Sequence, residues 1–247
     1  MHRMIQRGND SAYFDRPEAL SPLLHQLLIC RGIKTQEEAR RFLEPDASQL
    51  RDPFLLNDMY QAVDIIHQAL EKRLRVTVYG DYDVDGVCAA SILSMHLRSM
   101  GFEVDTYIPS RHYEGYGLNM NAVRKISEQS DLLITVDCGI TSVQEVALAR
   151  QLGLKIVVTD HHQPGPELPE CPVVNPVLNG YPFPSLCGAG TAFKLVCALS
   201  GFEAAQEYLD LAALATVADV VPLQDENRVL VRLGIKQINT LPRPGIA

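Results

Sequence analysis

The amino-acid sequence predicts an α/β protein with an open, mostly parallel sheet and helices on both faces of that sheet. A helical segment is expected before the sheet and a small helical region after it. From about residue 75 onward, short apolar runs alternate with helical stretches, which is typical of βαβ units. Neighbouring positions within the runs are both apolar, and this indicates strands that are covered on both faces.

The composition indicates a folded, globular protein. Of the 247 residues, 47% are hydrophobic and 21% are charged, which is enough for a core and leaves little room for extended disorder. The N-terminus is polar and no apolar run reaches the roughly eighteen residues of a membrane span. We therefore expect a cytoplasmic protein without a membrane partner.

The net charge of -8 argues mildly against a nucleic-acid partner, because phosphate binding favours basic surfaces. This argument weakens if part of the acid forms a metal site, since bound divalent ions reverse the local field. The six cysteines form no CxxC pair, so we expect reduced thiols rather than disulfides or a zinc site.

Residues 1–70 are expected to form the helical N-terminal segment, and residues 71–247 the main domain. Apolar residues recur at helical spacing between about residues 17 and 70, as in amphipathic helices. Thr35 is followed three residues later by Glu38, which is the pattern of a capping box at the start of a helix.

The main domain contains five short apolar runs that we expect to be strands. Between them, residues 87–99 have helical character and are followed by Gly101, a typical helix stop. Ser142 and Glu145 have the spacing of a second capping box. The expected strands cover residues 76–79, 104–108, 132–136, 156–159 and 173–174.

A proline-rich connector, residues 175–184, is expected after the last strand. Two helices should follow it, at about residues 191–199 and 203–217, and a further helical stretch begins near Arg228. The chain ends in LPRPGIA, which we expect to begin a linker to a missing C-terminal half of the same protein.

Three aspartates, Asp81, Asp83 and Asp85, follow the first expected strand in the motif GDYDVDG. Residues two apart in an extended segment point the same way, so these carboxylates could converge and would then need a compensating cation. A solvated acidic turn is the simpler alternative. A calcium loop of the EF-hand type fits less well, because a strand precedes the motif and Ile92 stands where that loop needs Glu.

Further polar clusters follow later strands. Asp137 comes directly after one strand, and Asp160, His161 and His162 come after the next along the chain. Paired histidines beside an aspartate suit a metal ligand with an orienting carboxylate. Asp219 ends an apolar helical stretch. Each of these residues, taken alone, also fits an ordinary turn or helix end.

The clusters share one expected location, the carboxyl edge of the parallel sheet, where open α/β sheets bind ligands. Carboxylates with one or two imidazoles suit Mn²⁺ or Mg²⁺ better than zinc. Two such ions sharing a carboxylate suit phosphoryl chemistry. We therefore expect a phosphoesterase with two Mn²⁺ or Mg²⁺ ions, held by Asp83, Asp85, Asp137, His161 and Asp219.

The motifs resemble those of the DHH phosphoesterase superfamily, and in particular those of its bacterial single-strand-specific exonucleases. The resemblance extends from about residue 23 to the end of the chain. It implies metal-dependent hydrolysis of phosphodiester bonds in single-stranded DNA from the 5′ end, in DNA repair and recombination. The motifs that carry it are GDYDVDG, IPSR, EGYG, VDCG, TDHH, CGAGTAFK and ATVADVVPL.

The resemblance also implies roles for the metal ligands. Asp83 would bind one ion with support from Asp81, and Asp137 would bridge this ion to the second. The second ion would be held by Asp85, His161 and Asp219.

The catalytic residues implied by the resemblance are Asp137 and His161 together with their neighbours His162 and Asp160. His162 would lie near the scissile phosphate, and Asp160 would orient the imidazoles.

Four residues are expected to bind the substrate, each with a simpler alternative. Arg111 could contact a phosphate, since its fork matches phosphate oxygens, or form a surface ion pair. Tyr116, like Tyr113, could stack on a base or only pack. Gly188 and Gly190 could let backbone N–H groups approach a phosphate, or could permit close helix packing.

Two features depart from the family pattern. Tyr79 stands where many relatives have His, and a phenol is a poor ligand, so the first ion would be held either more weakly or by Asp81 and water instead. The relatives continue into a DHH-associated domain and an OB-fold, and we expect neither domain within these 247 residues. Two alternatives to the exonuclease remain: an enzyme for short oligonucleotides or cyclic dinucleotides, and a non-catalytic nucleic-acid-binding scaffold.

Overall fold

The computed structural model describes residues 20–178 and 180–247. The polar N-terminus and residues 17–19 of the expected helical segment lie outside these ranges. The chain divides into two units between Gln49 and Leu50, whereas the sequence predicts a division after residue 70. The difference lies in residues 50–70, which pack with the second unit.

The first unit is a pair of helices with a small core of its own. Thr35 caps the second helix: its Oγ1 accepts the N–H of Glu38 at 3.1 Å, and Glu38 Oε2 accepts the N–H of Thr35 at 3.2 Å. The expected capping box is therefore confirmed. The elements are α1 (Pro22–Cys30), α2 (Gln36–Leu43) and the 3₁₀ turn η1 (Ala47–Gln49), and the buried core residues are Leu28, Ile33 and Ala39.

The second unit contains a five-stranded parallel sheet in the order β2-β1-β3-β4-β5. Strand β2 therefore lies on one side of β1, whereas β3, β4 and β5 follow on the other side, so the strand order reverses at β1. The predicted α/β fold is confirmed, and the strands lie within one residue of their expected bounds. They are β1 (Val76–Tyr79), β2 (Val104–Tyr107), β3 (Leu132–Val136), β4 (Lys155–Thr159) and β5 (Val173–Val174).

Helices and 3₁₀ turns fill the remainder of the second unit. They are η2 (Pro53–Leu55), α3 (Met59–Glu71), α4 (Val84–Ser99), α5 (Met120–Ser127), α6 (Val143–Gln151), α7 (Gly188–Ser200), α8 (Phe202–Ala205), η3 (Gln206–Tyr208), α9 (Leu209–Ala218) and α10 (Asp225–Thr240).

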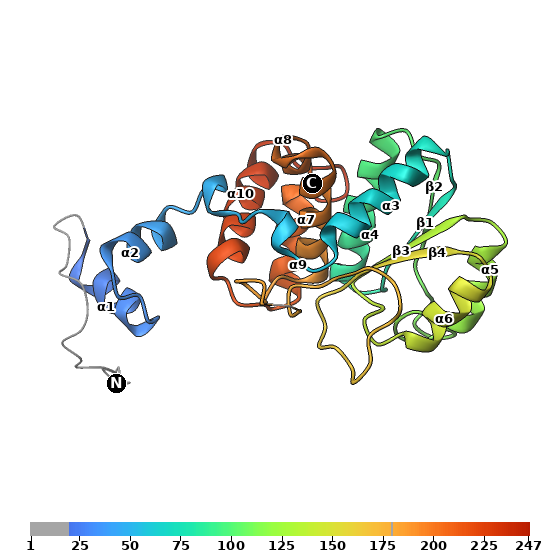
Figure 1. Cartoon of the computed structure of the whole chain (residues 1–247). Coiled ribbons are helices and arrows are strands. Elements are labelled where there is room, and N and C mark those ends of the chain that lie inside the picture. The colour runs from blue at the N-terminus through green and yellow to red at the C-terminus, as the bar shows by residue number, and fades with distance from the viewer. Residues whose placement is uncertain (1–19, 179) are drawn as a thin grey trace. The chain divides into compact units, whose positions relative to one another are not determined.

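Alternate strand residues face two separate apolar layers. In β1, Val76 and Val78 pack into the larger core with α3, α4 and α7, whereas Tyr79 packs into a second core with α5 and α6. Figure 1 shows α3 and α4 on one side of the sheet and α5 and α6 on the other. Because successive strand residues point to opposite faces, the strands between these layers are mostly apolar on both faces. The edge strand β2 differs from the expected covered strand, because it exposes Asp105 and Thr106.

Several expected helix ends need correction. Helix α4 begins at Val84 rather than residue 87, because Asp83 caps its N-terminus. Ser142 is the N-cap of α6 but makes no side-chain capping bond, so the second capping box is wrong. The stretch expected as one helix over 203–217 is divided into α8, η3 and α9, and the last helix begins at Asp225 rather than near Arg228.

The strand register brings three aspartates to one level. Tyr79 pairs with Thr135, and Thr135 pairs with Val158. Two residues further along each strand, these pairings align Asp81, Asp137 and Asp160. They lie at the carboxyl edge where the strand order reverses, which is the usual ligand crevice of doubly wound sheets.

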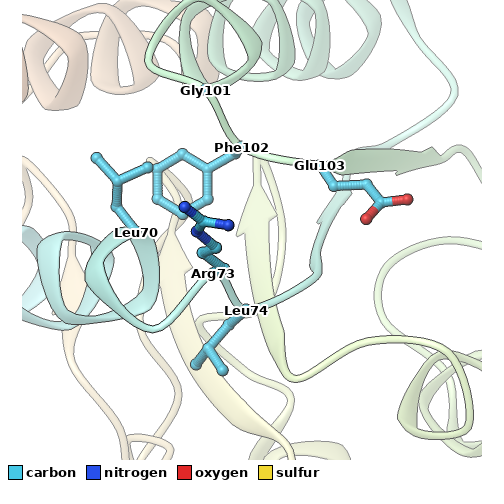
Figure 2. A pocket seen from close by; sticks show the side chains of 6 residues that line it. All are labelled: Leu70, Arg73, Leu74, Gly101, Phe102 and Glu103. Atoms are coloured by element: carbon cyan, nitrogen blue, oxygen red, sulfur yellow. The ribbon is translucent and has the colours of Figure 1, made fainter.

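A separate pocket lies at the opposite edge of the sheet, between the end of α3 and the starts of β1 and β2. Figure 2 shows its lining side chains, which include Arg73, Phe102 and Glu103. These residues precede the strands, so the pocket is remote from the aspartates that follow them. Among the described helices, none has both the length and the apolarity needed to cross a membrane.

Candidate metal centre

The turn between β1 and α4 positions the first three aspartates. Asp81 is fully buried, and its Oδ1 accepts the N–H of Tyr82 at 2.7 Å. Asp83 caps α4, because its Oδ1 accepts the N–H of Gly86 at 2.9 Å. A Cβ on Gly86 would lie 2.5 Å from the carbonyl oxygen of Asp81. Glycine is therefore required here for α4 to start so close to the strand.

Asp85 lies in the first turn of α4 and points toward the start of α7. Its Oδ2 accepts the N–H of Gly188 at 2.6 Å, and its Oδ1 accepts the N–H of Ala189 at 2.8 Å. First-turn N–H groups of a helix have no partner within that helix. The carboxylate of Asp85 supplies the partner for two of them, and its orientation is fixed in return.

Asp137 follows β3 in a left-handed backbone conformation with φ of 60°. This region is uncommon for residues other than glycine, and Asp and Asn are enriched among the exceptions. The side chain is 2% exposed. Its Oδ1 lies 3.1 Å from His161 Nε2 but accepts no hydrogen bond from the described residues.

His161 follows β4 and faces three carboxylates. Its Nε2 lies 3.1 Å from Asp137 Oδ1, 3.6 Å from Asp85 Oδ2 and 3.9 Å from Asp219 Oδ2. Asp219 reaches this position because α9 ends at Ala218 and Asp219 forms the C-cap. One imidazole thus joins groups from four elements, β3, β4, α4 and α9.

His162 is oriented by Asp160. The Oδ1 of Asp160 accepts the ring Nδ1–H of His162 at 2.7 Å, and its Oδ2 accepts the N–H of Ile140 at 2.9 Å. Burial alone would raise the pKa of Asp160, but these hydrogen bonds outweigh it and lower that pKa. The same bond raises the pKa of His162. Asp160 does not contact the ring of His161, so of the two imidazoles it orients that of His162.

The carboxylates of the cluster repel one another. Burial, followed by the charges of Asp85 and Asp83, raises the pKa of Asp137 to about 10. Burial also raises the pKa values of Asp81 and Asp219, and neighbouring carboxylates add to both effects. Such a cluster is stabilised by protons or by cations.

The donor set fits divalent ions. Among the described residues, ligand atoms within 4.8 Å of one another occur in three groups: Asp81, Asp83 and Asp137 in the first, Asp85, His161 and Asp219 in the second, and Asp137, His161 and His162 in the third, which links the other two. The Oδ2 of Asp81 and the Oδ1 of Asp137 are buried without a hydrogen-bond partner among the described residues. A buried carboxylate oxygen without a donor is costly, and coordination to Mn²⁺ or Mg²⁺ would satisfy both atoms.

Sequence comparison now places the chain in a family. Residues 75–216 match the model of the DHH family, N-terminal domain. The chain belongs to the DHH family. This match covers the strands that carry the aspartates and ends three residues before Asp219.

The DHH-family relatives most similar in sequence include three bacterial proteins named single-stranded-DNA-specific exonuclease RecJ. The chain is 46% identical to the Bacillus subtilis protein over 98% of its own length, 38% identical to the Escherichia coli protein over 94%, and 39% identical to the Thermus thermophilus protein over 90%. It spans only 31%, 43% and 32% of these proteins, respectively.

Solved structures agree with the fold. A crystal structure of exonuclease RecJ bound to manganese matches 77% of this chain and 49% of that chain, with 41% identity and a TM-score of 0.72. The structure of Thermus thermophilus RecJ with Mn²⁺ matches 88% of this chain and 31% of that chain, with 36% identity and a TM-score of 0.76. The predicted resemblance is confirmed.

The structure brings the six expected metal ligands of this DHH-family chain together, and it separates the expected substrate-binding residues into two groups. The first group lies in the β2–α5 loop. Tyr116 Oη is 2.9 Å from His162 Nε2, and the Arg111 guanidinium lies over the Tyr82 ring, 5.5 Å from its centroid. Tyr113 is 92% exposed, and among the described residues its side chain makes neither a hydrogen bond nor a contact with another ring or a cation.

The second group is Gly188 and Gly190, at the start of α7. The N–H of Gly188 is bonded to Asp85, and the N–H of Gly190 is bonded to Cys187 Sγ at 3.4 Å. Both N–H groups that could have donated to a phosphate therefore already have hydrogen-bond partners within the protein. This geometry favours the packing alternative for these glycines.

Sequence reasoning missed three contributors. Tyr79 does not face the aspartates: it is fully buried, and its OH donates to the carbonyl of Gly117 at 2.8 Å, which anchors the loop that carries Tyr116. Cys187 caps α7 through its sulfur. Ala189 donates an N–H to Asp85. The glycine-rich start of a helix was the available signal for the last two, but no sequence pattern identifies the carboxylate they meet.

Proposed function

We propose that this chain carries the catalytic metal centre of a single-strand-specific DNA exonuclease of the RecJ type, which uses two Mn²⁺ or Mg²⁺ ions. The observation that carries the proposal is the pair of buried carboxylate oxygens without donors among the described residues, Asp81 Oδ2 and Asp137 Oδ1. Both residues belong to one ligand group, and Asp137 also belongs to a group with His161. The RecJ names of the relatives and the manganese and magnesium in their structures support it.

The residues of the centre would bind the two ions in two sets. Asp81 and Asp83 would hold the first ion, and Asp85, His161 and Asp219 the second, with Asp137 shared between them. Bound here, the ions would activate a water molecule and stabilise the charge on the phosphoryl group. Asp137 fixes the separation of the two groups through its buried, left-handed position.

His162 and its neighbours would meet the phosphate. Because Nδ1 of His162 is bonded to Asp160, its Nε2 points toward the β2–α5 loop and Tyr116. A scissile phosphate there would accept a hydrogen bond from the protonated ring, whose pKa is raised. Arg111 of this loop lies over the ring of Tyr82 and would contact a second phosphate. Because the relatives are bacterial proteins, in whose cells DNA lies in the cytoplasm, we propose a cytoplasmic location.

The first test is hydrolysis of a 5′-phosphorylated single-stranded oligonucleotide with Mn²⁺, compared with the same sequence as a duplex. The matched control is Asp137→Asn, because Asn tolerates the left-handed backbone and keeps the shape without the charge. We expect cleavage of the single strand, and a loss of roughly 100-fold or more in the variant, because several kcal/mol of transition-state stabilisation depend on the metal.

Other outcomes separate the alternatives. Cleavage of a cyclic dinucleotide but not of the oligonucleotide would favour the small-substrate enzyme. Single-strand binding with no cleavage and no effect of Mn²⁺ on the melting temperature would favour the scaffold. Labels at the 5′ and 3′ ends would show the direction, and early release of the 5′ label is the expected result.

A further inference from the structure

Helix α7 begins directly against the carboxylate of Asp85. The N–H groups of Gly188 and Ala189 each donate to one oxygen of this carboxylate, at 2.6 and 2.8 Å. The N-terminal end of a helix also carries a partial positive charge that stabilises a nearby anion. The first peptide units of α7 therefore fix both the position and the plane of the Asp85 side chain.

The same residue, Gly188, also borders Asp137. A Cβ placed on Gly188 would lie 2.5 Å from Asp137 Cβ and 2.6 Å from Asp137 Cγ, and it would also overlap Asp137 Oδ1. Real Cβ atoms essentially never approach other atoms this closely. The space occupied by the Asp137 side chain therefore exists only because residue 188 has no side chain.

Gly190, two residues further along α7, differs in this respect. A Cβ there would lie 3.5 Å from the side chain of Leu186 and 3.7 Å from Leu230, which is ordinary van der Waals contact. Its N–H is bonded to Cys187 rather than to a carboxylate. The two glycines of the CGAG motif are thus physically distinct, and only Gly188 contacts the metal centre.

The Asp137 side chain is bordered by Gly188 and by His161, whose Nε2 lies 3.1 Å from Asp137 Oδ1. Its Oδ1 accepts no hydrogen bond from the described residues, and its backbone φ of 60° is unusual for a residue with a side chain. Packing against the backbone of Gly188 is therefore a principal determinant of where its carboxylate lies.

We propose that Gly188 is a positioning residue of the metal centre. Its N–H orients Asp85, and its lack of a side chain admits Asp137, so that one peptide unit sets the separation of two carboxylates. The inference rests on the proposed function, because it requires these carboxylates to bind Mn²⁺ or Mg²⁺. Adding a single methyl group at residue 188 would displace Asp137 from Asp85 and weaken metal binding.

The experiment compares Gly188→Ala with Gly190→Ala in titrations of the full chain with Mn²⁺ alone, followed by calorimetry. We expect about 10- to 100-fold weaker Mn²⁺ binding for Gly188→Ala, the usual effect of losing a residue that orients a metal ligand, and parental binding for Gly190→Ala. Near-UV circular dichroism establishes that each variant is folded. Parental Mn²⁺ affinity in folded Gly188→Ala would overturn the proposal.

A stability cycle without metal decides the case in which Gly188→Ala folds poorly. The change is made in the parent and in an Asp137→Gly background, where the three atoms nearest to a new Cβ are removed. We expect Gly188→Ala to lower the melting temperature in the parent and to have little effect in the Asp137→Gly background, since contacting residues are not additive. Equal losses in both backgrounds would overturn the proposal.

The two proposals fail in different ways. A parent chain that binds no Mn²⁺ would contradict the proposed function, and the stability cycle would still decide whether Gly188 makes room for Asp137. A parent that binds Mn²⁺ no more tightly than the folded Gly188→Ala variant does would leave the function intact and remove the role of Gly188.

Discussion

Lys194 and Glu226 form a buried ion pair between α7 and α10. Their Nζ and Oε1 atoms are 2.7 Å apart, and the two side chains are 2% and 0% exposed. Lys194 also donates to the carbonyl of Arg51. Glu226 accepts the N–H of Arg51 at 2.9 Å and the OH of Tyr181 at 2.6 Å. Each buried charge is thereby compensated, and the network ties the segment before η2 to both helices.

Replacing Lys194 by Met is expected to destabilise the chain by about 3–5 kcal/mol, because the change leaves the Glu226 carboxylate buried without its closest cation. Urea unfolding at neutral pH measures the loss. The double variant Lys194→Met/Glu226→Gln removes both charges and should lose less than the single variant. A double variant that is less stable than Lys194→Met would contradict this explanation.

Among the helices, α9 and α10 approach closely at Gly234. A Cβ there would lie 2.9 Å from the carbonyl carbon of Leu209 and would overlap its oxygen and the Cβ of Ala213. The contact matters for the metal centre, because α9 presents Asp219 at its C-terminal end.

Gly234→Ala is expected to lower stability by about 1–3 kcal/mol, as overpacked cores do, although alanine favours a helix over glycine. The matched control is Gly245→Ala, where a Cβ would meet nothing within 4 Å. Thermal unfolding followed by circular dichroism measures both. A Gly234→Ala chain as stable as the control would show that the two helices can separate at no cost.

The short edge strand β5 receives side-chain hydrogen bonds from a loop that is distant in the sequence. Asn57 Nδ2 donates to the carbonyl of Val173 at 3.1 Å, and Asp58 Oδ2 accepts the N–H of Val173 at 3.0 Å. Asp58 has a φ of 51°. These side chains occupy backbone groups at the edge of the sheet that would otherwise lack a hydrogen-bond partner from a neighbouring strand.

At the scale of the whole molecule, the two units have separate cores. Leu28, Ile33 and Ala39 form the core of the first unit. The larger core of the second unit contains Met59 and Ile66 of α3, both fully buried. Helix α3 is therefore part of the domain that carries the metal centre.

A chain that starts at Leu50 is expected to fold, to melt cooperatively and to bind Mn²⁺ like the full chain. A chain that starts at residue 71, the boundary expected from the sequence, should lose cooperative unfolding, because it exposes the apolar surface that α3 covers. Calorimetry of the two truncated chains measures this. Cooperative melting of the shorter chain at the parental temperature would restore the boundary near residue 70.

The sequence by itself determined the sheet and the chemistry of its edge. Strands covered on both faces are predominantly apolar, so β1, β3 and β5 appear in the sequence with their observed bounds. The carboxyl ends of parallel strands meet at one edge, so Asp83, Asp137 and His161 could be placed together without knowledge of their distances.

Only the tertiary structure decided which groups those residues meet. The start of α7 suited either a phosphate or close packing, and the fold filled it with Asp85, which lies 103 residues earlier in the chain. Tyr79 stands at the position where many relatives have His, and the strand pleat turns it toward the second core. Residues 50–70 were read as part of the N-terminal segment because their helical pattern continues that of the preceding residues. A pattern along the chain records which face of an element is apolar, but the partner of that face is set by long-range packing.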